Sequence, residues 1–411
     1  MELTKGRYQI QGMDVQKIAN EFGTPLYVYD ASRIEEQYLK MQNAFKGLNV
    51  KIKYAAKALT NLSVLKLLKK LGSGLDAVSI GEVILGLKAG FDQKDILYTP
   101  NCVSFSEIKE AIKLGVRITI DNISILEQFG NEYGDKVPVC IRINPHILAG
   151  GHHKISTGHI DSKFGISIHQ TRHVHRIIHT YNIRIEGLHM HTGSDILDAE
   201  VFLNGAQLLV DVAREFKDLE FIDFGSGFKV AYREGDVATD VEDFGKKLGG
   251  AFEGFTREYG KNVEIWFEPG KFITSESGLL LVRTNVIKTT PATVFAGVDS
   301  GMNHLIRPMM YDSYHDMVNI SNPKGIPRVY SVVGYICETD TLGWDRKLNE
   351  VREGDIIAIK NAGAYGFSMA SNYNSRERPA EVMIINGEAK LIRKRENIDD
   401  LVRNMVDIEI E

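Results

Sequence analysis

The chain has 411 residues, of which 43% are hydrophobic and 25% are charged, as in soluble globular proteins with one large or two moderate domains. Its 49 Lys and Arg residues against 54 Asp and Glu residues give a net charge of −5 without a basic block, which argues against nucleic acid as a partner. No segment approaches the roughly 18 consecutive apolar residues of a membrane span, and the first residues lack the apolar core of a signal peptide. We therefore expect a cytoplasmic protein without membrane contact.

Apolar, β-rich runs alternate with amphipathic stretches as far as residue 280. The eight candidate strands cover residues 50–58, 74–80, 96–100, 117–122, 137–145, 183–193, 219–227 and 263–270. Segments with helical spacing of apolar residues, such as LSVLKLLKKLG, separate them. Because near-continuous apolar strands that alternate with helices form parallel sheets buried on both faces, the pattern predicts an α/β fold, a (β/α)₈ TIM-type barrel over residues 26–280. An open, doubly wound sheet is the alternative.

Beyond residue 280 the pattern changes to short strands with turn residues between them, as in TVFAGVD, RVYSVVGYICE and AEVMIING. This pattern of short strands predicts a C-terminal all-β domain over residues 281–411. Residues 1–25 fall outside the barrel, and YQIQGMDV within them is expected to add a strand and a helix to the β domain. No Pro/Gly-rich linker separates the two domains.

One lysine stands among small residues in KYAAKALTN, residues 53–61, where the first barrel strand ends. Barrel enzymes build their active sites at the C-terminal ends of the strands. A lysine flanked by alanines there is partly desolvated, and its amine can then attack a carbonyl. The alternative is that Lys57 only extends to solvent at the rim.

Other strands bring further chemistry to the same rim. Glycines after strands seven and eight are typical of phosphate sites in barrels, because they let backbone N–H groups approach the oxygens. The other strand ends supply carboxylate, guanidinium and imidazole groups. The rim residues are Asp76, Arg142, His189, His191, Ser194, Gly225, Gly227, Glu268, Gly270 and Lys271. A cofactor with both an aldehyde and a phosphate would use such a set, which points to pyridoxal 5′-phosphate.

The chain also resembles a known family along most of its length. The matching segments are YAAKA, LDAVSIGE, RINP, STGHIDSKFGI, GLHMHTGSDI, DFGSG, EPGKF, DSGMNHLIRPMMYDSYH, CETD and NAGAYGFSMASNYNSRERPAEV. They are similar to those of the pyridoxal-phosphate-dependent decarboxylases of the alanine-racemase-like fold (fold type III), and among them to the diaminopimelate decarboxylases. Two positions depart from the family pattern: Lys271 replaces an arginine, and Ser226 replaces the middle glycine of three.

The resemblance implies a role for each matching position. Lys57 would form the Schiff base with the cofactor, His191 would stack on its ring, and Glu268 would face the pyridine nitrogen. Asp76, Arg142 and Lys271 also belong to the implied cofactor site. The residues implied to surround the phosphate are Ser194, Gly225, Gly227, Gly270 and Tyr365. A carboxylate at Glu268 favours decarboxylation over racemisation, because it keeps the pyridine nitrogen protonated.

The resemblance further implies a homodimer with shared active sites. Cys337, as proton donor, and Glu338 would come from the partner subunit. Arg307, Tyr311, Glu338 and Tyr365, together with Lys271, would contact the substrate. Since Lys271 replaces a bidentate arginine with a point charge, we expect its contact with the substrate carboxylate to be weaker or mediated by water. Without the resemblance, Cys337 reads equally well as a buried structural cysteine, and Cys102 and Cys140 keep that interpretation.

We therefore expect decarboxylation of the amino acid meso-2,6-diaminopimelate to L-lysine and CO₂, the last step of lysine biosynthesis. One alternative is a decarboxylase of another basic amino acid or polyamine precursor, such as ornithine, arginine or carboxynorspermidine. Another is a non-catalytic homologue that regulates a protein partner, against which the presence of both Lys57 and Cys337 argues. His175 and His179 lie one helical turn apart, but no matching carboxylate or cysteine is near in sequence, so we expect no metal.

Overall fold

The computed structural model describes residues 1–147, 161–193 and 199–410. Contacts divide the chain into two units: residues 35–231 with 236–273, and residues 1–34 with 232–235 and 274–411. The division falls after residues 34 and 273, several residues from the expected boundaries at 26 and 280. The reason is strand β4 (Leu26–Asp30), which pairs with β14 and β20 of the second unit.

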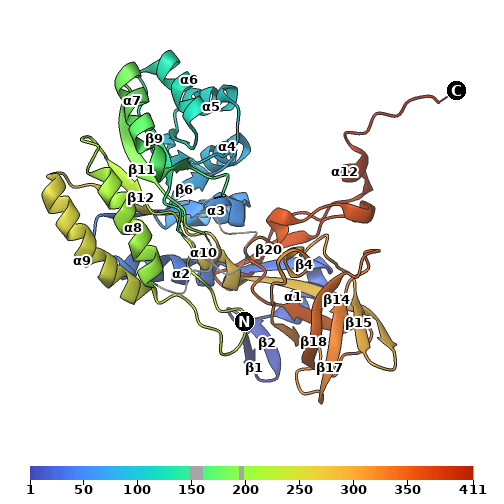
Figure 1. Cartoon of the computed structure of the whole chain (residues 1–411). Coiled ribbons are helices and arrows are strands. Elements are labelled where there is room, and N and C mark those ends of the chain that lie inside the picture. The colour runs from blue at the N-terminus through green and yellow to red at the C-terminus, as the bar shows by residue number, and fades with distance from the viewer. Residues whose placement is uncertain (148–160, 194–198, 411) are drawn as a thin grey trace. The chain divides into compact units, whose positions relative to one another are not determined.

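The first unit is a closed barrel of eight parallel strands (Figure 1). The strands are β5 (Val50–Ala55), β6 (Gly74–Ala77), β7 (Ile96–Tyr98), β8 (Arg117–Ile120), β9 (Val139–Asn144), β11 (Ile185–His189), β12 (Phe221–Asp223) and β13 (Glu264–Phe267). Pairing of β8 with β9 and of β13 with β5 closes the sheet. The short β10 (Ile166–Ser167) also pairs with β9. The prediction of a TIM-type barrel is confirmed, with strands shorter than the apolar runs.

A helix follows each barrel strand. These helices are α3 (Leu62–Lys70), α4 (Ile80–Ala89), α5 (Phe105–Lys113), α6 (Ile123–Tyr133), α7 (Thr171–Tyr181), α8 (Ala199–Ala213), α9 (Val241–Tyr259) and α10 (Lys271–Thr274), and α2 (Ala31–Ala44) precedes the first strand. Side chains of Asn61, Ser79, Asn122 and Asp240 accept backbone N–H groups at the starts of α3, α4, α6 and α9. These caps end the loops after the strands, where the rim residues lie.

The barrel interior is packed rather than open. Leu97, Cys140, Phe221 and Trp266 form one buried cluster although they come from β7, β9, β12 and β13, so they meet across the barrel. The Phe221 and Trp266 rings stack with centroids 3.5 Å apart. Gly187 of β11 permits this packing, because a Cβ there would lie 2.3 Å from the Phe221 ring. Cys140 is buried in the core as expected, whereas Cys102 is exposed, so the expectation of a buried structural cysteine is wrong for Cys102.

The second unit is mostly β, as expected from the sequence. One sheet has the strand order β18-β17-β15-β14-β4-β20-β21, with β19 pairing to β14 and β16 to β19, and a small sheet joins β1, β2 and β3. The elements are β1 (Glu2–Thr4), β2 (Arg7–Ile10), β3 (Met13–Asp14), α1 (Val15–Phe22), β14 (Gly278–Thr289), β15 (Val294–Val298), α11 (Arg307–Tyr311), β16 (Met317–Asn319), β17 (Pro327–Val333), β18 (Thr341–Asn349), β19 (Ile356–Ile359), β20 (Ala380–Ile385), β21 (Glu388–Arg393) and α12 (Ile398–Val402).

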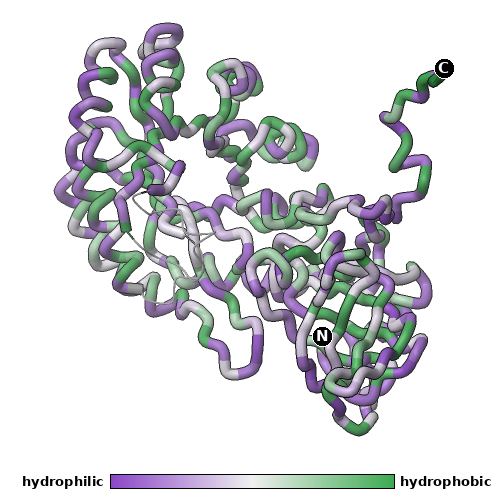
Figure 2. Tube along the Cα trace, turned by 45° about the vertical axis from the view of Figure 1, so that its right-hand side comes forward, coloured by the Kyte–Doolittle hydropathy of each residue, from purple (hydrophilic) through white to green (hydrophobic). Residues whose placement is uncertain are grey.

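N-terminal residues contribute to the core of this second unit. Ile10 of β2 and Val15 and Ile18 of α1 pack in one buried cluster with residues of β4, β14, β19 and β20. Asp14 caps α1 by accepting the backbone N–H of Gln16 at 3.0 Å. The segment YQIQGMDV, expected to add one strand and a helix, thus contributes to two short strands, β2 and β3, and to the start of a helix. Figure 2 shows hydrophobic stretches running through the strands, while the outer helices of the barrel alternate between hydrophilic and hydrophobic residues.

Within the described ranges, none of the helices combines the length and apolar character that crossing a bilayer requires.

Candidate active site

Lys57 lies at the C-terminal end of the first barrel strand. Strand β5 ends at Ala55, and residues 56–58 form a turn of 3₁₀-helix that carries the lysine over the rim. Its Nζ lies 3.0 Å from Oδ2 of Asp76, a fully buried carboxyl at the end of β6. Thr99 donates a hydrogen bond to the other oxygen of Asp76. A buried carboxyl therefore fixes the position of the lysine amine.

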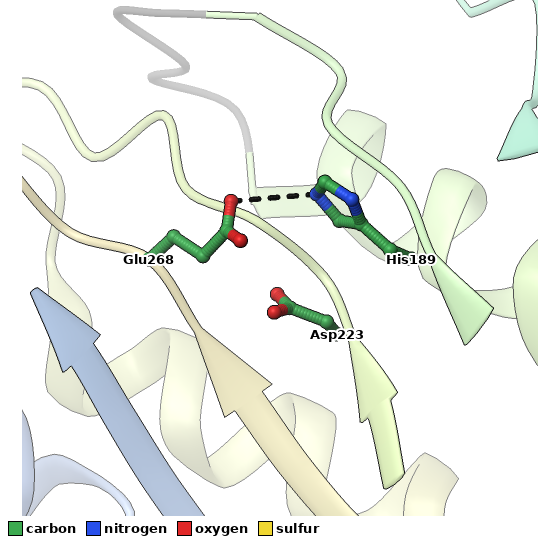
Figure 3. A group of neighbouring side chains, drawn as sticks. All are labelled: His189, Asp223 and Glu268. Carbon is green, nitrogen blue, oxygen red and sulfur yellow. Dashed lines mark ion pairs between the residues drawn. The ribbon is translucent and has the colours of Figure 1, made fainter. Parts of the chain in front are cut away.

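Two further acids lie on neighbouring strands with a histidine, as Figure 3 shows. His189 ends β11, Asp223 ends β12, and Glu268 follows β13. Nε2 of His189 forms an ion pair with Oε2 of Glu268 at 3.3 Å, and both side chains are buried. The potential ligand atoms of all three residues lie within 4.8 Å of one another, close enough to hold a metal ion. The group was not foreseen as a unit, because only strand register brings Asp223 level with His189.

The surroundings shift the pKa values of the two carboxyl groups of this trio in opposite directions. Burial raises the pKa of Asp223 well above its usual range, and the neighbouring Glu268 adds to the effect. Burial also raises the pKa of Glu268, but His189, Lys57 and His191 outweigh it and hold that pKa below its usual range. The surroundings therefore favour the protonated form of Asp223 and the ionised form of Glu268. Within the described residues, Oε1 of Glu268 is buried without a hydrogen-bond partner.

His191 presents a neutral ring to the same rim. Its Nδ1 accepts a hydrogen bond from the backbone N–H of Ser226 at 3.2 Å. Burial, and then the nearby positive charges of Arg142 and Lys57, lower the pKa of His191 to about 3. An imidazole that stays uncharged and fixed at one nitrogen can stack its face on a flat ligand.

The glycine loop after β12 runs directly beside His191. Gly225 has φ +65°, and a Cβ on it would lie 2.6 Å from both Nδ1 of His191 and the carbonyl oxygen of Met190. The backbone N–H of Gly225 donates to Asp223 at 2.8 Å, and its carbonyl accepts from the backbone N–H of Glu268 at 2.7 Å. The loop therefore needs glycine for its backbone conformation as well as for its close approach.

Gly270 and Arg142 complete the rim of the barrel. A Cβ on Gly270 would lie 2.9 Å from Cβ of Ala58, so the loop after β13 packs closely on the turn that holds Lys57. Arg142 is buried, with its guanidinium carbon 4.8 Å from the centre of the Phe164 ring. Burial lowers the pKa of Arg142. Lys271 begins α10. Gly227 lies two residues beyond Gly225, and Ser194 lies outside the described residues.

These groups surround one cavity of about 320 Å³. Its lining consists of Lys57, Val78, Thr99, Asn101, Arg142, Phe164, His189, His191 and Glu268. This volume lies within the range of small-molecule sites, and a few polar groups converge on it. Val78, Asn101 and Phe164 were missed from the sequence, because apolar or amide side chains just after a strand carry no distinct signal.

The remaining candidate residues lie in the second unit. Arg307 begins α11 and is 9% exposed; its Nη2 lies 3.4 Å from Oη of Tyr232 and 3.3 Å from Oγ of Ser313. Its guanidinium carbon lies 5.9 Å from the ring centres of both Tyr311 and Tyr365. Nε of Arg307 is buried and has no hydrogen-bond partner among the described residues.

Cys337 and Glu338 are exposed, and both contact the short turn at residues 373–375. Tyr373 donates a hydrogen bond to Glu338 at 2.8 Å, and the side-chain amide of Asn374 contacts Sγ of Cys337. Asp340, which is buried, accepts the backbone N–H of Ile336 at 2.8 Å and so fixes the turn that carries both residues. The sequence had not singled out Tyr373 or Asn374.

Comparison with known proteins identifies the family. Residues 31–275 match the model of the pyridoxal-dependent decarboxylases, pyridoxal binding domain. The chain is 41% identical to a diaminopimelate decarboxylase of Methanothermobacter thermautotrophicus over 97% of its own length and 95% of the relative's. The chain belongs to the pyridoxal-dependent decarboxylases. The relative from Haemophilus influenzae, also named diaminopimelate decarboxylase, is 36% identical over 95% of each chain.

Solved structures of this decarboxylase family share the fold. Diaminopimelate decarboxylase from Helicobacter pylori in complex with L-lysine has a TM-score of 0.88 and 35% identity, covering 95% of this chain and 98% of its own. Diaminopimelate decarboxylase from M. jannaschii in co-complex with L-lysine has a TM-score of 0.88 and 33% identity. The match covers 99% of this chain and 98% of the M. jannaschii chain.

The barrel rim fits the family's cofactor, pyridoxal phosphate. Lys57 offers an amine held by a buried carboxyl. Glu268 offers an ionised oxygen without a partner in the described structure, suited to a protonated pyridine nitrogen. Gly225 lets its loop approach His191 more closely than a residue with a Cβ could. The protein is thus a decarboxylase that uses pyridoxal phosphate, and the roles of the single residues stay predictions.

His175 lies on the histidine-rich helix α7 and pairs with a carboxylate. Its Nε2 lies 2.7 Å from Oε2 of Glu215, a carboxylate forty residues further along the chain. Both side chains are at least one-third exposed. We interpret the pair as a surface ion pair, which contributes little to stability.

Proposed function

We propose that the enzyme decarboxylates meso-2,6-diaminopimelate to L-lysine and CO₂. The observation that carries this choice of substrate is Arg307: a buried guanidinium, ringed by tyrosines, whose Nε has no partner among the described residues. Such a group matches a carboxylate, which it can bind through two parallel hydrogen bonds. The relatives' names and the L-lysine bound in two of their structures support the same reaction.

The distal end of the substrate carries both an ammonium group and a carboxylate. Arg307 and Tyr311 would donate hydrogen bonds to this carboxylate, and Glu338 would accept them from the ammonium group. Ornithine and lysine lack the distal carboxylate and would leave Arg307 buried without a counterion. Because an unpaired buried charge costs several kcal/mol, we expect a preference of about a thousandfold or more.

The barrel residues act on the reacting end. When bound, pyridoxal phosphate accepts the electron pair that the departing CO₂ leaves on the α-carbon. Lys57 would bind the cofactor's aldehyde carbon, while Asp76 keeps the lysine in place. Glu268 would accept a hydrogen bond from the pyridine N–H and keep that nitrogen protonated. His191 would restrain the ring by stacking, and the glycines at 225, 227 and 270 would surround the phosphate.

Cys337 would then protonate the carbon that has lost CO₂. The thiol S–H bond breaks, a C–H bond forms, and the electron pair stays on sulfur until water returns a proton. We also propose that the active protein is a homodimer in which Cys337 and Glu338 serve the barrel of the other subunit. The family resemblance of the CETD segment and the exposure of both side chains support this arrangement.

The test is a set of kcat/KM values for meso-diaminopimelate, lysine, ornithine and arginine with added pyridoxal phosphate. We expect strong preference for meso-diaminopimelate, and we expect Arg307→Ala to lose most of it. Arg307→Lys is the matched variant, because it keeps the charge and loses the fork, and should retain part of the preference. Comparable values for ornithine and meso-diaminopimelate in the unmodified enzyme would contradict the proposal and favour a decarboxylase of another basic amino acid.

A further inference from the structure

The turn beside Cys337 has an unusual backbone. Residues 373–375 form a short 3₁₀ turn in which Asn374 has φ 58° and ψ 28°, and the next residue, Ser375, has φ 53°. Two consecutive non-glycine residues with positive φ are uncommon, because the Cβ then lies too close to the backbone. Such strain persists where neighbouring structure holds it, and it concentrates at functional sites.

The strained turn carries a side-chain amide to the Cys337 sulfur. Nδ2 of Asn374 lies 3.2 Å from Sγ of Cys337, and Oδ1 of the same amide lies 3.5 Å from it. Because both amide atoms are within reach of sulfur, either orientation of the amide presents one donor and one acceptor to it. The contact joins residues 37 positions apart in the chain, so it is not a consequence of local sequence.

This pairing suits a sulfur that changes its protonation state. A thiol can donate its proton to the amide oxygen, while a thiolate can only accept and would bind the amide N–H. An anion gains more from a donated hydrogen bond than a neutral thiol does. The other titratable groups at this place are Glu338 and Tyr373, which bind each other at 2.8 Å, and the Tyr373 hydroxyl also interacts with the Cys337 sulfur. A negative Glu338 opposes a second negative charge on sulfur. Asn374 supplies an uncharged donor that offsets it.

We propose that Asn374 is a positioning residue for Cys337, which holds the thiol in one orientation and stabilises the thiolate left after proton transfer. The inference rests on the proposed role of Cys337 as proton donor. It adds the requirement that the sulfur keep a hydrogen-bond partner both before and after it gives up its proton.

Alkylation of Cys337 tests this without reference to turnover. The full-length holoenzyme carrying Cys102→Ser leaves Cys337 as its exposed cysteine, since Cys140 is buried. The rate of reaction with iodoacetamide, followed by mass spectrometry between pH 6 and 10, reports how much thiolate is present at each pH.

Two substitutions separate the amide from the backbone. Asn374→Gly removes the amide but accepts the left-handed conformation without strain. Asn374→Asp keeps the shape but replaces the donor with an anion. We expect the alkylation rate at pH 7 to fall about tenfold in the glycine variant and further in the aspartate variant, with rates converging at high pH. Asn386→Gly is the matched control, because Asn386 has φ 54° in the turn between β20 and β21.

The outcomes decide the proposal. An unchanged or faster reaction at pH 7 in Asn374→Gly, or an aspartate variant that reacts like the unmodified protein, overturns it. If Asn386→Gly lowers the alkylation rate of Cys337 equally, the effect comes from a general loosening of the protein, and the proposal is also overturned. If Cys337→Ala keeps full decarboxylase activity, the proposed role of Cys337 fails, whereas the alkylation result still measures the effect of Asn374 on the sulfur.

Discussion

The ion pair between His189 and Glu268 can be tested by replacing the histidine with leucine. His189→Leu leaves the Glu268 carboxyl buried at 4% side-chain exposure without the imidazole that does most to lower its pKa. Breaking a buried pair in this way costs about 3–5 kcal/mol, because the remaining charge is neither hydrated nor compensated. We therefore expect the apoprotein to lose about this much stability at pH 7.

Two companion variants make the expectation specific. Asp223→Asn should cost far less, about 1 kcal/mol, because burial raises the pKa of this carboxyl and so favours its neutral form, and asparagine retains an acceptor for the backbone N–H of Gly225. Adding Glu268→Gln to His189→Leu should recover most of the loss, since it removes the unpaired charge. The double-mutant cycle then gives a coupling of several kcal/mol.

The stability effect also has a defined pH dependence. The pKa of Glu268 is lower in the folded protein than its ordinary value of 4.5, so the pair contributes stability above about pH 4.5 that is lost as the pH falls. The difference between His189→Leu and the unmodified protein should therefore shrink in acid. Urea unfolding is followed by fluorescence of Trp266, which is 2% exposed in the barrel, with the exposed Trp344 replaced by phenylalanine. A loss below 1 kcal/mol for His189→Leu, or an equal loss for Asp223→Asn, would refute the reasoning.

Three further predictions follow from the same structure. Borohydride reduction of the holoenzyme should attach the pyridoxyl group to the peptide that contains Lys57, and a modified lysine elsewhere would be inconsistent with the assigned role. Mixed Lys57→Ala and Cys337→Ala chains should regain about a quarter of the unmodified activity, since half of the random dimers have one complete site; no recovery after verified subunit exchange would mean that one chain builds the site. Burial, and then Arg307, lower the pKa of His315 to about 3, so the unfolded chain takes up a proton below about pH 6.5 that the folded protein excludes. Stability should thus fall as the pH drops from 6.5 towards 3, and His315→Gln should flatten this slope in denaturation curves; an unchanged slope would count against it.

The barrel could be predicted because the sequence alternates apolar strand patterns with amphipathic helix patterns. Eight apolar runs separated by helical spacing specify parallel strands, and the rule that catalytic groups lie at their C-terminal ends placed Lys57 and Asp76 at one rim. The structure puts their side chains 3.0 Å apart. The strand lengths were overestimated, since residues such as Ala56 and Lys57 continue the apolar run but turn over the rim as a 3₁₀ turn.

Features that depend on register or on distant contacts could not be predicted. Asp223 reads as an ordinary strand residue, and only its register opposite His189 shows that it borders Glu268. Asn374 reads as a turn residue, and its contact with Cys337 requires two loops of the β unit to meet. Strand β4 lies in the same sheet as β14, although some 250 residues separate them in the sequence, so the observed boundary after residue 34 had no local signal.

The most direct measurement is the product balance with meso-2,6-diaminopimelate. Purified enzyme with pyridoxal phosphate should release one equivalent of CO₂ and one of L-lysine for each substrate consumed, and should do so far faster than it decarboxylates ornithine. Lys57→Ala should form neither product above the background. Failure to form lysine from meso-diaminopimelate, with the cofactor shown to be bound, would contradict the account.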